Sequence, residues 1–132
     1  MSELVSTVFI LFCLLQIKHM FADYFLQTPR MLAGRATYWH LGRAQHALIH
    51  AIGSAAALLL IGAPIGFILT ICAAEWVVHF HIDWAKAHHS ETCGYCPNDA
   101  GFWRAAGIDQ ALHQFTYIAL VWAWVRFSTH LA

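Results

Sequence analysis

The chain has 132 residues, of which 60% are hydrophobic and only 11% are charged, and its net charge is zero when the histidines are neutral. Soluble domains usually carry roughly 25% charged residues, so this composition argues against an ordinary water-soluble domain, and the lack of basic excess argues against a nucleic-acid partner. A membrane span needs about 20 apolar residues, so four spans would use nearly the whole chain and leave one integral membrane domain, residues 1–132.

The predicted elements are four long helices arranged as two hairpins. The first helix stops before Thr28-Pro29, because proline restricts the residue before it and donates no backbone hydrogen bond. Gly62-Ala63-Pro64 predicts a tight turn between the second and third helices, and a loop with Gly94 and Pro97 precedes the fourth. We therefore expect an all-α fold, a four-helix transmembrane bundle. The four helices are expected over about residues 3–27, 41–61, 65–88 and 101–129.

Basic residues give the expected orientation in the bilayer. Arg30, Arg35 and Arg43 flank the first long connection, and Lys86 and Arg104 flank the second, whereas the turn between the hairpin helices is uncharged. Cytoplasmic loops of membrane proteins are enriched in Lys and Arg. Both long loops are therefore expected in the cytoplasm, with both termini on the other side of the membrane and the lipid bilayer as the principal partner.

Each predicted helix carries one pair of side chains at i, i+4 spacing, a His with an Asp on three helices and two His on the second, and this spacing puts both members on one face of the helix. The pairs lie near the ends of the first and third helices and near the starts of the second and fourth. At about 1.5 Å per residue, each pair is roughly 5–12 Å from its helix end, so alternating chain direction brings all four to one level. The pairs are His19 and Asp23, His46 and His50, His79 and Asp83, and Asp109 and His113.

Carboxylates at this depth need compensation, because each costs about 2.5–3.5 kcal/mol even on a lenient insertion scale. A divalent metal ion would neutralise several of them and use neutral imidazoles as ligands, as in the dinuclear sites of helical bundles. We therefore predict that all eight residues of the four pairs ligate zinc, manganese or iron, with His46 the outlying member because it lies nearest the loop. A layer of hydrogen bonds between helices is the alternative. One layer deeper, Lys18 is expected to form an ion pair with Glu75.

Such a site favours a metal-dependent membrane hydrolase. A divalent metal ion lowers the pKa of a coordinated water toward neutrality and polarises a carbonyl or phosphoryl oxygen. The level of the layer, near the lipid headgroups, indicates a lipid or lipid-linked substrate. The expected catalytic residues are carboxylates that ligate the metal or act as general base, and side chains that orient the substrate or hold a leaving oxygen: Asp23, Asp83 and Asp109, then Gln27, Lys86 and Gln110.

Other functions fit the same residues. His-x-x-x-His boxes also occur in membrane di-iron desaturases and hydroxylases, and two histidines can hold a b-type haem. A polar layer can also be a transient site for transported protons or metal ions, although the helices beyond this layer are apolar and so small a chain would need to form a homo-oligomer to conduct. In a non-catalytic interpretation, the His/Asp layer only fixes the packing of the helices.

The second loop offers another metal site, which would comprise His89, Cys93 and Cys96. A Cys-x-x-Cys preceded by histidines could complete a zinc tetrahedron, and a cytoplasmic loop disfavours a lasting disulfide. A single Cys-x-x-Cys is a weak signal, and free thiols are the competing interpretation.

Together these motifs resemble a family of small bacterial and phage membrane proteins, domain of unknown function 3307. The family's pattern has a His-x-x-x-Asp followed by Leu-Gln, a His-x-x-x-His, a His-x-x-x-Asp with a nearby Lys, and an Asp-Gln-x-x-His. The resemblance implies a bacterial inner (cytoplasmic) membrane location and supports the importance of these residues, but it names no activity and does not include the Cys-x-x-Cys loop. In this chain the four parts are His19 to Gln27, His46 to His50, His79 to Lys86, and Asp109 to His113.

Overall fold

The computed structural model describes residues 2–131, with side chains described as far as Thr129, and this part of the chain is helical and contains no strand. The all-α class is therefore confirmed. Four long helices and one short helix make up the fold: α1 (Glu3–Tyr24), α2 (Pro29–Leu32), α3 (Leu41–Leu60), α4 (Ile65–Thr92) and α5 (Ala100–Leu131).

Helix boundaries differ most from the prediction around the first connection. Helix α1 ends at Tyr24, about one turn early, because the backbone N–H groups of Phe25 and Leu26 both donate to the carbonyl of Phe21 and turn the chain away. Pro29 then begins α2 instead of simply ending a helix, since proline suits the first helical position, and the Thr28 hydroxyl accepts the N–H of Met31.

The turn between α3 and α4 has the geometry that its sequence predicts. Gly62 adopts a left-handed backbone with φ of +77°, and its N–H donates to Leu59 while the N–H of Ala63 donates to Leu58. This pair of bonds is a Schellman motif, which satisfies the last carbonyls of a helix. At its other end α4 continues to Thr92, about one turn beyond the prediction.

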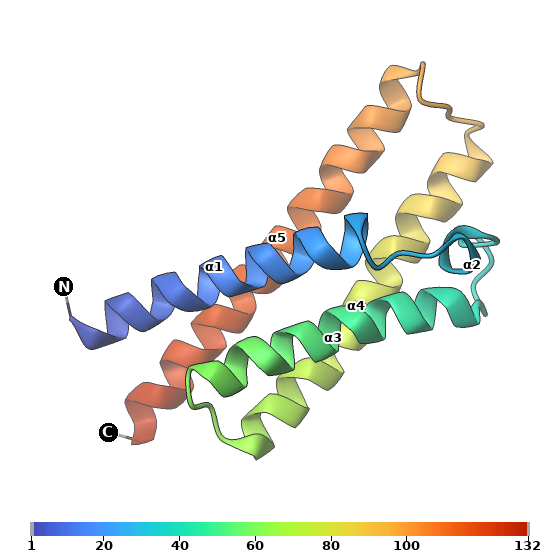
Figure 1. Ribbon diagram of the computed structural model, residues 1–132. Helices are drawn as coiled ribbons and strands as arrows, with labels where there is room; N and C mark the ends of the chain where they lie inside the picture. The colour runs from blue at the N-terminus through green and yellow to red at the C-terminus, as the bar shows by residue number, and fades with distance from the viewer. Residues whose placement is uncertain (1, 132) are drawn as a thin grey trace.

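The long helices pack so that each has two long neighbours. Helix α1 contacts α3 and α5, and α4 contacts the same two helices. Figure 1 shows the N-terminus, the C-terminus and the α3–α4 turn at one end of the molecule, with the connection that contains α2 toward the other end. There α4 and α5 continue past α1 as a projecting arm. Buried apolar side chains fill the space between the helices at the first end: Leu11, Leu15, Leu58, Ile68, Tyr117, Leu120, Val121 and Trp124.

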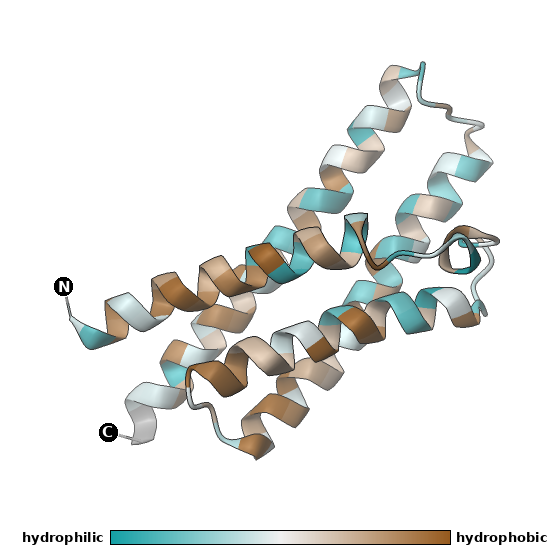
Figure 2. Ribbon diagram, in the orientation of Figure 1, coloured by the Kyte–Doolittle hydropathy of each residue, from teal (hydrophilic) through white to brown (hydrophobic). Residues whose placement is uncertain are grey.

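Within residues 2–131, two helices, α1 and α4, are long and apolar enough to cross a membrane. Helices α3 and α5 carry more polar side chains in their first halves, including Arg43 in α3 and Arg104 in α5. Large apolar side chains nevertheless cover the outer surface, since Phe9 is 60% exposed and Trp122 65%. Figure 2 shows hydrophobic residues concentrated along α1, the second half of α3 and the first half of α4, with hydrophilic ones toward the arm. Exposed apolar surface of this extent marks a membrane or partner contact.

Candidate metal centre

The four predicted His/Asp pairs come together in the structure, one pair from each long helix. All five histidines of the layer are buried, with at most 5% of each residue exposed. The aspartate side chains are more open, at 17% for Asp23, 21% for Asp83 and 11% for Asp109. Imidazoles therefore form the inner part of the layer, and carboxylates lie between them and the more open side.

Asp23, from α1, is the centre of the first half of the layer. Three imidazole Nε2 atoms face its carboxylate: those of His50 at 3.0 Å, and of His19 and His46 at 3.3 Å each. His19 comes from the preceding turn of α1, while His46 and His50 come from α3. The i, i+4 spacing on α1 thus places one imidazole, that of His19, next to the carboxylate. The contact between α1 and α3 supplies the other two, those of His46 and His50.

Asp83, from α4, is the centre of the second half. Its carboxylate oxygens lie 3.2 Å from Nε2 of His113, 3.3 Å from Nε2 of His79 and 3.7 Å from Nε2 of His46. His46 therefore faces both carboxylates, although the sequence suggested it as the outlying member. Asp109, from α5, lies 3.7 Å from Nε2 of His113 at the edge of this half.

The arrangement brings together side chains that could hold a metal ion. The ligand atoms lie within 4.8 Å of one another in three overlapping groups of residues. The ring centroids of His50 and His79 are 3.9 Å apart. Among the described residues, Nε2 of His79 and Oδ1 of Asp109 are buried and make no hydrogen bond of good geometry, although each has a partner of the layer at 3.3 Å and 3.7 Å respectively. A buried polar atom without a hydrogen bond is unfavourable unless something else satisfies it. The three groups are His46, His50 and His79; His19, Asp23 and His50; and His79, Asp83 and His113.

Tyr117 holds two of these imidazoles from behind. Its hydroxyl oxygen lies 2.8 Å from Nδ1 of His19 and 3.4 Å from Nδ1 of His50, so it contacts the ring nitrogens that face away from Asp23. Partners of this kind fix ring orientation in metal sites. Tyr117 follows His113 by one helical turn, and that spacing was the only sequence signal for it.

Below this layer, the predicted ion pair between Lys18 and Glu75 is confirmed. The Lys18 ammonium lies 2.6 Å from Oε1 of Glu75 and also donates to the carbonyl of His50 at 3.1 Å. It lies 4.5 Å from the centroid of the Tyr117 ring. The deeper layer is therefore attached to the His/Asp layer through one backbone carbonyl and one aromatic ring.

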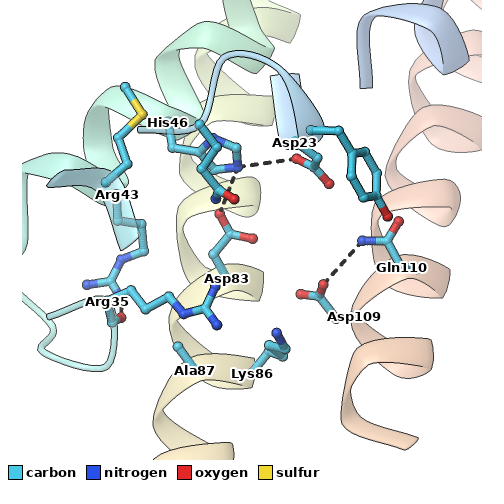
Figure 3. A pocket seen from close by; sticks show the side chains of 12 residues that line it. Asp23, Arg35, Arg43, His46, Asp83, Lys86, Ala87, Asp109 and Gln110 are labelled. Atoms are coloured by element: carbon cyan, nitrogen blue, oxygen red, sulfur yellow. Dashed lines mark hydrogen bonds and ion pairs between the residues drawn. The ribbon is translucent and has the colours of Figure 1, made fainter. Parts of the chain in front are cut away.

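A pocket of about 180 Å³ opens on the carboxylate side of the layer. Figure 3 shows Asp23, Asp83 and Asp109 around it, with His46 at its inner end. The three predicted substrate-orienting side chains also line it, although Gln27 lies beyond the end of α1 instead of in its last turn. The wall also contains Arg43 and Arg35, and the sequence had indicated no role in the site for Arg35. The lining residues are Asp23, Tyr24, Gln27, Met31, Arg35, Arg43, His46, Asp83, Lys86, Ala87, Asp109 and Gln110.

The second candidate site, in the loop after α4, is less developed. The Cys93 sulfur lies 3.8 Å from Nδ1 of His89, and Cys93 and Cys96 are exposed free thiols. Among the described residues, the groups that could hold a metal come from the His/Asp layer and do not include these three. The Asp99 carboxylate accepts the N–H of Cys96 at 2.8 Å, and this bond lowers the pKa of Asp99 below its usual value.

Comparison with known proteins identifies the family. The family model described as "Protein of unknown function (DUF3307)" matches residues 10–132. The chain belongs to this family. The matched residues include all four His/Asp pairs. No curated protein and no solved structure matches the chain.

Proposed function

We propose that this DUF3307 protein is a membrane-embedded, metal-dependent hydrolase that acts on a lipid or lipid-linked substrate near the cytoplasmic face. The observation that carries the proposal is that Asp23 and Asp83 are each faced by three imidazole Nε2 atoms within 3.7 Å. Imidazole nitrogen and carboxylate oxygen are the donors that zinc, manganese and iron accept, and these donors come from four different helices.

The membrane part of the proposal extends the two apolar helices to four spans. Helices α3 and α5 pack between α1 and α4, so a bilayer that surrounds α1 and α4 would enclose their neighbours as well. Their histidines of the layer would then face the interior, where His46, His50 and His113 are buried. With Arg35 and Lys86 in the lining of the pocket, the preference of basic residues for the cytoplasm directs the pocket to that face.

The chain's own residues divide the work of hydrolysis. A divalent cation held by the layer would supply a Lewis acid that polarises the scissile ester or phosphoryl group. Hydrolysis adds water across one bond: the water oxygen bonds to the acyl or phosphoryl centre, and its proton passes to a carboxylate of the layer. The leaving oxygen takes a proton and departs as an alcohol. Asp109, whose Oδ1 atom accepts no hydrogen bond from the described residues, is the carboxylate that we assign to accept the proton, and Gln27 and Gln110 orient the substrate in the pocket.

Elemental analysis by mass spectrometry of the detergent-purified protein tests the metal first. We expect one or two equivalents of zinc, manganese or iron in the wild type, and loss of metal in Asp23→Ala and His79→Ala. His88→Ala is the matched control, because His88 is an exposed histidine of α4 outside the layer. Circular dichroism should show the same helix content in all four proteins. A wild type that binds no metal, even after reconstitution, would remove the basis of the proposal.

The metal-loaded protein is then incubated with bacterial lipid extract, and products are identified by mass spectrometry. Turnover that is lost in Asp109→Asn while metal is retained would support hydrolysis. Ion flux in proteoliposomes without turnover would instead assign the layer to transport. Metal or hydrogen bonding with neither activity would leave a structural layer, and an absorbance scan of the same sample would reveal haem.

A further inference from the structure

Two cations of the pocket, Arg35 and Lys86, have no role in holding the His/Asp layer together. Both line the pocket, and Figure 3 shows their side chains together on the far side of Asp83 from His46 and Asp23. Among the described residues, the ion pairs found within 4.0 Å at this layer join histidines to aspartates, and neither cation takes part in one. Three carboxylates line the same pocket, so the absence of pairing leaves both cations available to a ligand.

The structure holds these cations in place through the backbone. Arg43 is only 2% exposed, and its guanidinium donates to the carbonyls of Arg35, Thr37 and Tyr38. One buried arginine thereby fixes the loop segment that carries Arg35. Lys86 follows Asp83 by three residues on α4, so it lies on the same helical face nearly one turn farther out. The two cations therefore converge from a braced loop and from a long helix.

The charge of the pocket determines which ligand it favours. With neutral imidazoles, the carboxylates of Asp23, Asp83 and Asp109 are balanced by Arg35, Arg43 and Lys86. Each divalent cation bound by the layer adds two positive charges. A metal-loaded pocket is therefore positively charged, and Arg35 and Lys86 are cations of its lining without an ion-pair partner in the described layer. An anion that bridges these cations and the layer would restore neutrality.

We propose that Arg35 and Lys86 form a seat for a phosphate group, so that the substrate is a phosphate-bearing molecule whose phosphate lies between these cations and the His/Asp layer. This inference rests on the proposed function and narrows its substrate class. Arginine presents a planar donor pair that matches two phosphate oxygens, and lysine adds a point charge. The phosphate could belong to a lipid headgroup or to a soluble molecule, and the seat would recognise either.

Isothermal titration of the metal-loaded protein with inorganic phosphate in a nonionic detergent tests the seat. We expect Arg35→Gln and Lys86→Gln each to raise the dissociation constant by about tenfold, as for the loss of one charged hydrogen bond, and removal of the metal to weaken binding as well. Arg30→Gln is the control, since Arg30 is an exposed cation of the neighbouring α2 that does not line the pocket. Metal content is measured in every variant.

A second arm distinguishes the sources of phosphate. Wild type and variants are placed in phosphatidylcholine nanodiscs doped with either phosphatidic acid or diacylglycerol, and lipid retained after mild detergent extraction is measured by native mass spectrometry. Retention of phosphatidic acid that depends on Arg35 and Lys86 assigns the seat to a lipid headgroup. Binding of inorganic phosphate alone, with the same dependence, assigns it to a soluble phosphate compound.

The two proposals fail in different ways. Phosphate and phosphatidic acid binding that is absent, or unchanged in both Arg35→Gln and Lys86→Gln, would overturn the seat while the metal site still stands. A protein that takes up no metal would overturn the proposed function. If phosphate binding in that protein still depended on both cations, the seat would remain as an anion site.

Discussion

The buried ion pair of Lys18 and Glu75 gives a sharp test of how the interior is held together. Glu75 is 3% exposed, and its Oε1 atom lies 2.6 Å from the Lys18 ammonium. In Glu75→Gln the ammonium stays in the interior with the carbonyl of His50 and the ring of Tyr117 as its remaining partners. Removing one member of a buried pair generally costs about 3–5 kcal/mol. We therefore expect the free energy of unfolding to fall by about that amount.

A double substitution separates the pair from its surroundings. Replacing a buried ion pair with apolar side chains of similar volume is often neutral or stabilising. Lys18→Met combined with Glu75→Leu should therefore recover most of the stability that either single substitution loses. The coupling free energy is the loss of stability in the double variant minus the sum of the losses in the two single variants. The double variant should therefore lose at least about 2 kcal/mol less than that sum.

Equilibrium unfolding measures these free energies. The purified protein is titrated with sodium dodecyl sulfate in mixed micelles, and the transition is followed by far-ultraviolet circular dichroism. Glu91→Gln is the control, because Glu91 is an exposed carboxylate near the end of the same helix, and it should change stability by less than about 0.5 kcal/mol. A loss below about 1 kcal/mol in Glu75→Gln, or additive single effects, would refute the reasoning.

Three further substitutions test the site and its support. Tyr117→Phe removes the hydroxyl that contacts Nδ1 of two imidazoles of the layer. Metal affinity should therefore fall by about 10–100-fold, while saturating metal should still load the site fully. An unchanged metal affinity would exclude a supporting role for the hydroxyl. Arg43→Met removes the guanidinium that donates to three carbonyls of the loop before α3. Trypsin should therefore cleave after Arg35 several times faster in this variant than in the wild type, at unchanged helix content. Equal cleavage rates in the two proteins would contradict the inference that Arg43 holds this loop. Gly42→Ala places a Cβ 2.6 Å from the carbonyl oxygen of Arg30 and should lower stability by about 1–3 kcal/mol. Gly66→Ala, also in a first helical turn but in open space, should not.

The sequence was sufficient to predict the four long helices and the residues of the layer, because both follow from periodicity. An i, i+4 repeat of His and Asp on an apolar helix fixes which face is polar, and polar faces in an apolar setting turn toward one another. The buried Lys18–Glu75 pair followed from the same reasoning about depth. Among residues 2–131, helices α1 and α4 meet the length and composition of a span, because the polar pairs of α3 and α5 lie in helix halves that also carry Arg43 and Arg104.

What the sequence did not provide are contacts set by backbone turns and by the packing of helices. The early end of α1 at Tyr24 and the short α2 depend on carbonyls of the turn, which leave no periodic signal. The same holds for Arg43, whose partners are backbone oxygens of a loop. Tyr117 reads as an ordinary core aromatic until the position of its hydroxyl is known. These contacts are specific to the folded chain, and they orient groups whose presence the sequence had already indicated.

The position of His46 between two carboxylates makes the halves of the layer interdependent. Its Nε2 atom is 3.3 Å from Asp23 and 3.7 Å from Asp83, but one imidazole nitrogen has a single lone pair, or a single hydrogen, to offer. Whatever occupies one half with the help of His46 withdraws that ring from the other half. Two cations bound to this layer would therefore compete for one ligand, so the second equivalent should bind more weakly than the first, and the halves would fill in sequence.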